Sequence, residues 1–234
     1  MLYLFAHLFK IDMKKQLNLL VVITLLFVTN AFSQRPNYNI KNFIGLYGGI
    51  TQFDITTDNF VTEKQNGWIA GLTGIVNVEH KWYDVSYGIQ FSENNVNISG
   101  RMTDDVQGEV PIEYKLSAAQ LALFMHAKII GQNLAIDFGP VVQANGFLEL
   151  KDKAQEEYYI NGFDGLQAID LRDISKFNFN AAIGATAGLN NFRVRAQYQY
   201  GLTNILNKLN DLNIEGTKFK GNQSQVILTA MVLF

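Results

Sequence analysis

The chain has 234 residues, no cysteine and a formal net charge of −2. Without cysteine, a disulfide framework, a thiolate metal site, a cysteine nucleophile and a lipoprotein anchor are all excluded, and the lack of a basic excess argues against nucleic-acid binding. Charged residues make up only 17% of the chain and hydrophobic residues 48%, so few charges must cover a large surface.

The first segment in chain order has the features of a signal peptide. Lys14 and Lys15 follow Met13, residues 17–28 are mostly apolar, and Ala31 and Ser33 supply small residues at a cleavage site. This apolar run of about 12 residues is too short for a membrane-spanning helix, which needs roughly 20. The sequence predicts a signal peptide over residues 1–33, with Met13 as an alternative start, and a mature domain over residues 34–234.

Apolar and polar residues then alternate with a period of two, which predicts β-strands. In residues 192–203, for example, Val194 and Tyr198 fall on one face while Arg193 and Arg195 fall on the other. We expect eight strands, at residues 44–56, 67–81, 83–93, 111–130, 133–150, 177–189, 192–204 and 222–234. The fourth changes phase near Leu116–Ala119, where we expect a bulge.

The connections between these strands alternate in length. Short turns are predicted at residues 81–83, 131–132 and 190–191, and long loops at 57–66, 94–110, 151–176 and 205–221. Outer-membrane barrels have tight periplasmic turns and longer outer loops. The sequence therefore predicts an all-β fold, a closed eight-stranded antiparallel up-and-down transmembrane β-barrel in the outer membrane, with both termini periplasmic.

Alternation alone also fits a soluble lipocalin-like barrel, whose apolar face points inward. The polar face here is rich in Gly, Asn, Gln, Ser and Thr and poor in Lys and Glu, which suits a narrow lumen better than a solvated exterior. Aromatic residues near strand ends of the apolar face are expected in interfacial girdles. These residues are Phe43, Trp68, Trp82, Tyr83, Phe177, Phe192 and Tyr200.

The last strand has a terminal pattern of its own. Alternate apolar residues lead to a final phenylalanine and resemble the signal read by the barrel-assembly machinery: Val226, Leu228, Ala230, Val232 and Phe234. With the signal peptide, strand number and loop pattern, the mature chain resembles the PorT-like outer-membrane β-barrel proteins, and more distantly the OmpA-type small barrel. The resemblance is one of architecture; it implies a place in the cell envelope and a link to protein secretion.

Charged residues near the short turns point toward the predicted lumen, together with His126. We expect a lumenal charge cluster in the periplasmic half of the barrel, made of Glu79, Asp84, Lys128, Asp137, Arg193 and Arg195. An arginine on the lipid face costs about 2 to 4 kcal/mol at mid-membrane, so both arginines should point inward and pair with carboxylates. Gly88, Gly139, Gly184 and Gly201 would leave them room. A barrel of eight strands is just wide enough for side chains to fill, so a filled lumen is favoured over a pore.

No catalytic, cofactor or metal site is expected. His80 and His126 follow the signal without a G-x-S-x-G motif beside them. The acidic pairs Asp104–Asp105 and Glu156–Glu157 are interpreted as solvated loop charge, although they could help to bind a divalent ion. In the loop at 151–176, Tyr158, Tyr159 and Phe163 suit packing over the barrel mouth or contact with a partner.

The preferred hypothesis is a non-enzymatic envelope component that is structural or binds a partner. Its expected partners are membrane lipid, lipopolysaccharide, the barrel-assembly machinery and another envelope protein. A narrow passive transporter for small or hydrophobic solutes is the alternative, followed by a lipid-modifying enzyme and a soluble lipocalin-like binder.

Overall fold

The computed structural model describes residues 40–78, 80–103, 108–189, 191–212, 214 and 217–234. The expected signal peptide, Glu79 and the Asp104–Asp105 pair lie outside these residues.

Eight long strands form one closed antiparallel ring, which confirms the predicted fold class. Each strand pairs with its neighbours in chain order, and the last strand pairs with the first through a register that runs from Gly45↔Leu233 to Thr57↔Gly221. The strands are β1 (Ile40–Thr57), β2 (Thr62–Val78), β3 (Tyr83–Arg101), β4 (Val110–Ile130), β5 (Leu134–Leu150), β7 (Phe177–Leu189), β8 (Phe192–Gly201) and β9 (Gly221–Leu233).

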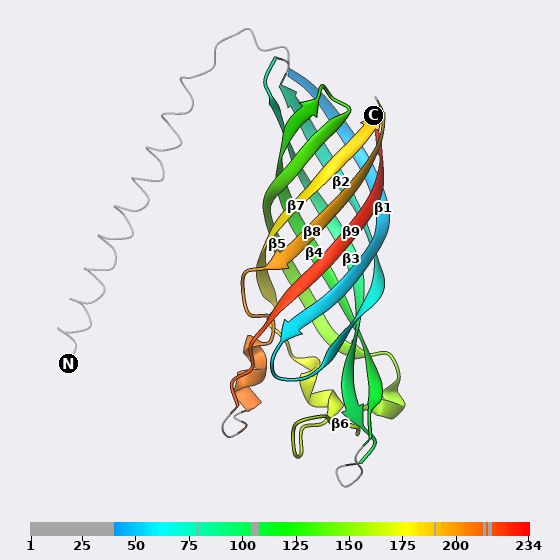
Figure 1. Ribbon diagram of the computed structural model, residues 1–234, viewed down its shortest axis with the longest axis vertical. Helices are drawn as coiled ribbons and strands as arrows, with labels where there is room; N and C mark the ends of the chain where they lie inside the picture. Colours follow the sequence, from blue (N-terminus) through cyan, green and yellow to red (C-terminus); the bar gives the residue numbers. More distant parts are fainter. Residues whose placement is uncertain (1–39, 79, 104–107, 190, 213, 215–216) are drawn as a thin grey trace, which may run out of the picture. The chain divides into compact units, whose positions relative to one another are not determined.

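The two ends of the barrel differ (Figure 1). At one end, the turn end, lie the three short connections and the C-terminal Phe234, whose backbone hydrogen-bonds with Ile44. At the other, the loop end, lie the connections β1–β2, β3–β4, β5–β7 and β8–β9. These carry the two-residue strand β6 (Tyr159–Ile160) and the 3-10 helices η1 (Lys153–Gln155), η2 (Ala168–Arg172) and η3 (Asn207–Leu212).

Two of the predicted loops are wrong in extent. β2 begins at Thr62 rather than residue 67, and β3 runs to Arg101 rather than residue 93. A strand needs about 9 to 11 residues to cross a membrane, whereas β3 has 19 and β4 has 21. These strands are long enough to continue well past a bilayer at the loop end.

The polarity of the two faces inverts along the strands. In the part of β3 nearer the turn end, Tyr87, Ile89 and Phe91 point outward and are exposed, while Ser86, Gln90 and Asn94 are buried in the lumen. Nearer the loop end, Glu93, Asn95 and Asn97 lie on the outward face, and Val96 and Ile98 are buried inside. We call the level at which the outward face changes from apolar to polar the rim. Residues above the rim lie nearer the loop end, and residues below it lie nearer the turn end.

The rim runs across neighbouring strands in register. Trp68 pairs with Glu93, and Glu93 pairs with Ser117. Above it on β4 and β5 the outward face carries the ion pairs Lys115–Glu149 at 3.7 Å and Lys151–Glu113 at 3.4 Å. Below it the outward side chains form an apolar belt around the ring.

The orientation of β8 confirms that the apolar face points outward. Val194 and Tyr198 are 41% and 43% exposed, whereas Arg193 and Arg195 are 9% and 4% exposed. A soluble lipocalin-like barrel would show the reverse. Of the aromatic residues predicted on the outer face, Trp68, Trp82, Phe177, Phe192 and Tyr200 are exposed there. Phe43 is a correction, because it packs inward against Tyr47, Ile75, Met231 and Leu233.

The predicted bulge is present, but its extra residue lies on β5. The register shifts between Leu116↔Leu148 and Ala118↔Asn145, so one more residue is present on β5 than on β4. Even-numbered residues of β4 stay buried from Ile112 to His126, which means that the phase change read at Leu116–Ala119 is a change of inward residues from apolar to polar. On β5 the buried positions do shift, from Asn145 to Leu148, across Gly146 and Phe147.

None of the helices in the part of the chain that the structure describes has both the length and the apolar character needed to cross a membrane.

Candidate functional site: the barrel lumen

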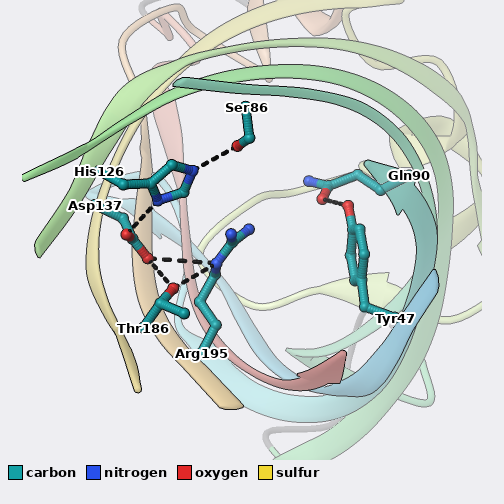
Figure 2. Close-up of polar contacts among 7 residues, drawn as sticks. All are labelled: Tyr47, Ser86, Gln90, His126, Asp137, Thr186 and Arg195. Carbon is teal, nitrogen blue, oxygen red and sulfur yellow. Dashed lines mark hydrogen bonds and ion pairs between the residues drawn. The ribbon is translucent and has the colours of Figure 1, made fainter. Parts of the chain in front are cut away.

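The lumen near the turn end holds a network of buried charges centred on Asp137. Asp137 is fully buried, and its Oδ1 lies 2.6 Å from Nδ1 of His126. Its Oδ2 lies 3.3 Å from Nε of Arg195 and accepts a hydrogen bond from the Thr186 hydroxyl. Arg195 Nε also donates to Thr186 at 3.0 Å, so the four strands β4, β5, β7 and β8 are joined at one carboxylate (Figure 2).

Strand register explains how this network is assembled. Asp84, His126 and Asp137 are directly opposite one another on β3, β4 and β5, and Thr186 is opposite Arg195 on β7 and β8. Since alternate residues share a face, these neighbours all point into the lumen. A buried carboxylate and guanidinium compensate each other only when they are paired and hydrogen-bonded, and here both conditions hold.

A second ion pair lies beside the first. Lys128 Nζ is 2.8 Å from Asp84 Oδ1, which also accepts the backbone N–H of Val78 at 3.0 Å. Arg193 points into the lumen as predicted, but the structure gives it no ion pair with any described residue. Arg193 lies two residues closer to the turn end than Arg195 and is more exposed, so it has less need of a buried partner. The sixth predicted member, Glu79, lies outside the described residues.

Ser86, His126 and Asp137 have the connectivity of a hydrolase triad. Ser86 Oγ is 2.7 Å from Nε2 of His126, and Nδ1 faces the carboxylate; both distances fall in the range of an activated nucleophile. Sequence analysis missed this arrangement because the three residues come from three strands. Ser86, however, has no exposed surface, and Asp137 is shared with Arg195, so the geometry is that of an internal hydrogen-bond chain that substrate cannot reach.

Amide side chains fill the middle of the lumen. Tyr47 donates to Gln90 at 2.6 Å, Gln90 donates to Gln120, and Gln120 donates to Gln143 at 2.6 Å. Other bonds between strands that are not neighbours include Gln143 to Gln223 at 2.9 Å and Gln225 to Asn94 at 2.7 Å. Polar atoms thus bond to one another across the centre of the barrel, as expected of a lumen filled by side chains.

The loop end is closed by a hydrophobic core, which we call the cap core. Inward residues of the strands above the rim meet residues of the long connections, and the Tyr114 hydroxyl donates to the carbonyl of Ala168 at 2.9 Å. Tyr158 and Phe163 pack against this core, as the packing interpretation of the 151–176 loop expects. Its largest fully buried members include Phe53, Ile55, Ile98, Ile112, Tyr114, Leu116, Leu148, Ile160, Leu171 and Phe219.

Arg101 links the end of β3 to the β5–β7 connection, which we call the cap. Its guanidinium donates to the carbonyls of Ile160 at 3.1 Å and Phe163 at 2.8 Å, and lies 3.8 Å from Asp164. β6 also pairs with the end of β3 at Gly100↔Ile160. These contacts hold the β5–β7 connection across the mouth of the barrel.

Comparison with known proteins gives similarity of fold only. No protein-family model matches the sequence, and no curated protein sequence matches it. Among solved structures the barrel is similar to Neisserial surface protein A, with 7% identity, a TM-score of 0.47, and coverage of 84% of this chain and 99% of that one. It is also similar to Ail, the attachment invasion locus protein of Yersinia pestis, with 12% identity, a TM-score of 0.44, and coverage of 83% and 99%. LpxR from Salmonella typhimurium has 8% identity, a TM-score of 0.26, and coverage of 83% and 100%.

Proposed function

We propose that the protein is a non-enzymatic outer-membrane β-barrel, a structural or partner-binding component of the cell envelope. The observation that carries this proposal is the inversion of polarity at the rim. An apolar belt faces outward where a bilayer would lie, and the outward face becomes polar and ion-paired just where the cap core begins. Such a surface is stable only with lipid below the rim and water above it.

The loop end is the outer side in this proposal, and both termini are periplasmic. Membrane lipid and lipopolysaccharide would contact the belt, and the assembly machinery would read the alternate residues of β9. Another envelope protein would bind the loop end or the turn end of the barrel, and the resemblance to PorT-like proteins favours a secretion-related partner. Recovery in the outer-membrane fraction, with gel mobility that changes on boiling, is the basic test; a periplasmic protein would overturn the proposal.

The filled lumen argues against the alternative of a passive transporter. Purified protein inserted into a planar bilayer should give no steady conductance, because both the amide layer and the cap core obstruct the lumen. A reproducible open channel of nanosiemens size would contradict this and support the transporter.

An enzymatic role can be tested at Ser86. A fluorophosphonate probe should not label the folded protein, because the Ser86 hydroxyl is not exposed; a known serine hydrolase serves as the positive control. Labelling of the folded chain that disappears in Ser86→Ala would instead identify a working triad.

A further inference from the structure

Phe147 lies at the rim on β5, and two cationic side chains lie over its ring. The ring is 43% exposed on the outer face at the bulge. The guanidinium of Arg172 lies 4.6 Å from the ring centroid, and the ammonium of Lys176 lies 3.4 Å from it. Cations over an aromatic ring are attracted by its negative face, so the ring fixes positive charge at the boundary between the belt and the polar wall.

A groove of about 400 Å³ runs on the outer wall just at and below this level. Most of its lining residues are small or aromatic, and the full set is Trp68, Phe91, Ser92, Glu93, Ser117, Ala118, Ala119, Ala144, Asn145 and Gly146. The groove meets the rim at Glu93 and Ser117, and on its turn-end side Phe91, Ala119 and Ala144 offer small and apolar surface that suits a hydrocarbon chain.

A second hollow, of about 350 Å³, lies directly above Phe147 along β5. It is lined by Leu148, Glu149, Leu150, Lys153, Glu156, Ile169 and Arg172. Glu149 is paired with Lys115, and Asp173 is paired with Lys176 at 3.3 Å. Arg172 and Lys153 have no carboxylate within ion-pair distance among the described residues, so these two cations are available to an anion.

We propose that these two hollows together bind one phosphate-bearing acyl lipid of the outer leaflet. The phosphate contacts Arg172 and Lys153, Phe147 lies at the glycerol level, and one acyl chain occupies the groove over Ala119 and Ala144. Glu156 also lines the upper hollow and opposes the phosphate. This inference rests on the proposed function, since it requires the loop end to lie at the outer surface of the membrane.

Native mass spectrometry of the full chain in detergent tests the site, with dioleoyl phosphatidylglycerol and dioleoyl phosphatidylcholine as probes. The wild type should prefer the anionic lipid. The double variant Lys153→Gln with Arg172→Gln should bind it about twenty-five-fold more weakly, because each basic residue near an anionic lipid contributes about five-fold. The matched control, Lys218→Gln with Lys220→Gln, removes two exposed lysines elsewhere at the loop end and should bind as the wild type does.

Two single variants separate the parts of the site. Ala119→Leu fills the groove and should weaken both lipids equally, while Glu156→Gln removes the opposing charge and should strengthen the anionic lipid. Soluble glycerol phosphate, which has no acyl chain, should bind far more weakly than either lipid.

Equal binding of the two lipids by the wild type, or equal losses in the two double variants, would overturn the site. If the Lys153–Arg172 variant does not fold, unchanged binding in both single variants is decisive against it. If lipid binding fails in these ways but the chain is recovered in the outer membrane with heat-modifiable mobility, the lipid site is wrong and the proposed function is retained. If the chain does not reach the outer membrane, both the lipid site and the proposed function are wrong.

Discussion

Asp137 is the residue on which the polar interior depends most. It serves His126, Thr186 and Arg195 at once, and none of these contacts can be replaced by water because the carboxylate is fully buried. Breaking a buried pair from one side costs more than the pair itself contributes, since the remaining charge is left unpaired.

Asp137→Asn should therefore destabilise the barrel by about 3 to 5 kcal/mol, the usual cost of an uncompensated buried charge. Urea unfolding in detergent micelles, followed by heat-modifiable gel mobility, measures the change. Asp211→Asn is the control, because Asp211 pairs with Lys208 on the surface and such pairs contribute about 0 to 1 kcal/mol. Adding Arg195→Gln to Asp137→Asn should restore part of the loss; no recovery would contradict the role of this pair.

From the sequence, the face of the barrel on which a residue lies was easier to predict than its hydrogen-bond and ion-pair partners. The period of two placed Asp84, Lys128, Asp137, Arg193 and Arg195 inside without knowledge of the fold. It could not identify Ser86 and Thr186 as partners, because partners depend on the register between strands, which alternation along a single strand does not contain. For the same reason, both arginines were expected to be paired, although the structure gives an ion pair to Arg195 alone among the described residues.

At the scale of the element, the strands pass through two environments. In β3 and β4 the even-numbered residues point inward on both sides of the rim. At the rim the inward residues change from polar to apolar, and the outward residues change from apolar to polar. The predicted ends of the second and third strands were wrong because apolar residues were assumed to point outward everywhere. Once Val96 and Ile98 are understood as inward, alternation continues to Arg101.

Since the chain has no native cysteine, single cysteines can map the rim. Glu113→Cys, on the outer face of β4 above the rim, should react in whole cells with a membrane-impermeant maleimide. Leu121→Cys, eight residues further along β4 and in the belt, should not react until the membrane is dissolved. Trp82→Cys at the turn end should react only after the outer membrane is permeabilised; labelling of Trp82→Cys in intact cells would reverse the proposed orientation.

At the scale of the whole barrel, the interior is built from two materials. Hydrogen-bonded amides and ions fill the part within the belt, and an apolar core of the kind found in soluble domains fills the part above the rim. The fold class and strand number were predictable from alternation and loop lengths. Packing of Tyr158 and Phe163 over the barrel mouth was expected, but the full cap core was not predictable, because it depends on contacts between the β5–β7 and β8–β9 connections, which share no local pattern.

Because Arg101 ties the β5–β7 connection to the barrel, Arg101→Gln should loosen the cap without opening the ring. Loss of charged hydrogen bonds worth about 1.5 to 3 kcal/mol should increase the rate of proteolytic cleavage within residues 151–176 by at least about ten-fold. Limited proteolysis of intact cells measures this, with unchanged heat-modifiable mobility as evidence that the ring survives. Equal cleavage of variant and wild type would show that Arg101 does not hold the cap.

The seam between β1 and β9 has a consequence for biogenesis. The ring joins Gly45 to Leu233, so nearly the whole described chain must be synthesised before the sheet can close. Until then the growing polypeptide has two unpaired borders, each a template for pairing with another copy, and the late closure carries the entropic cost of a very long intervening segment. Late closure of the seam therefore leaves both borders open to pairing with other copies until the last strand is in place.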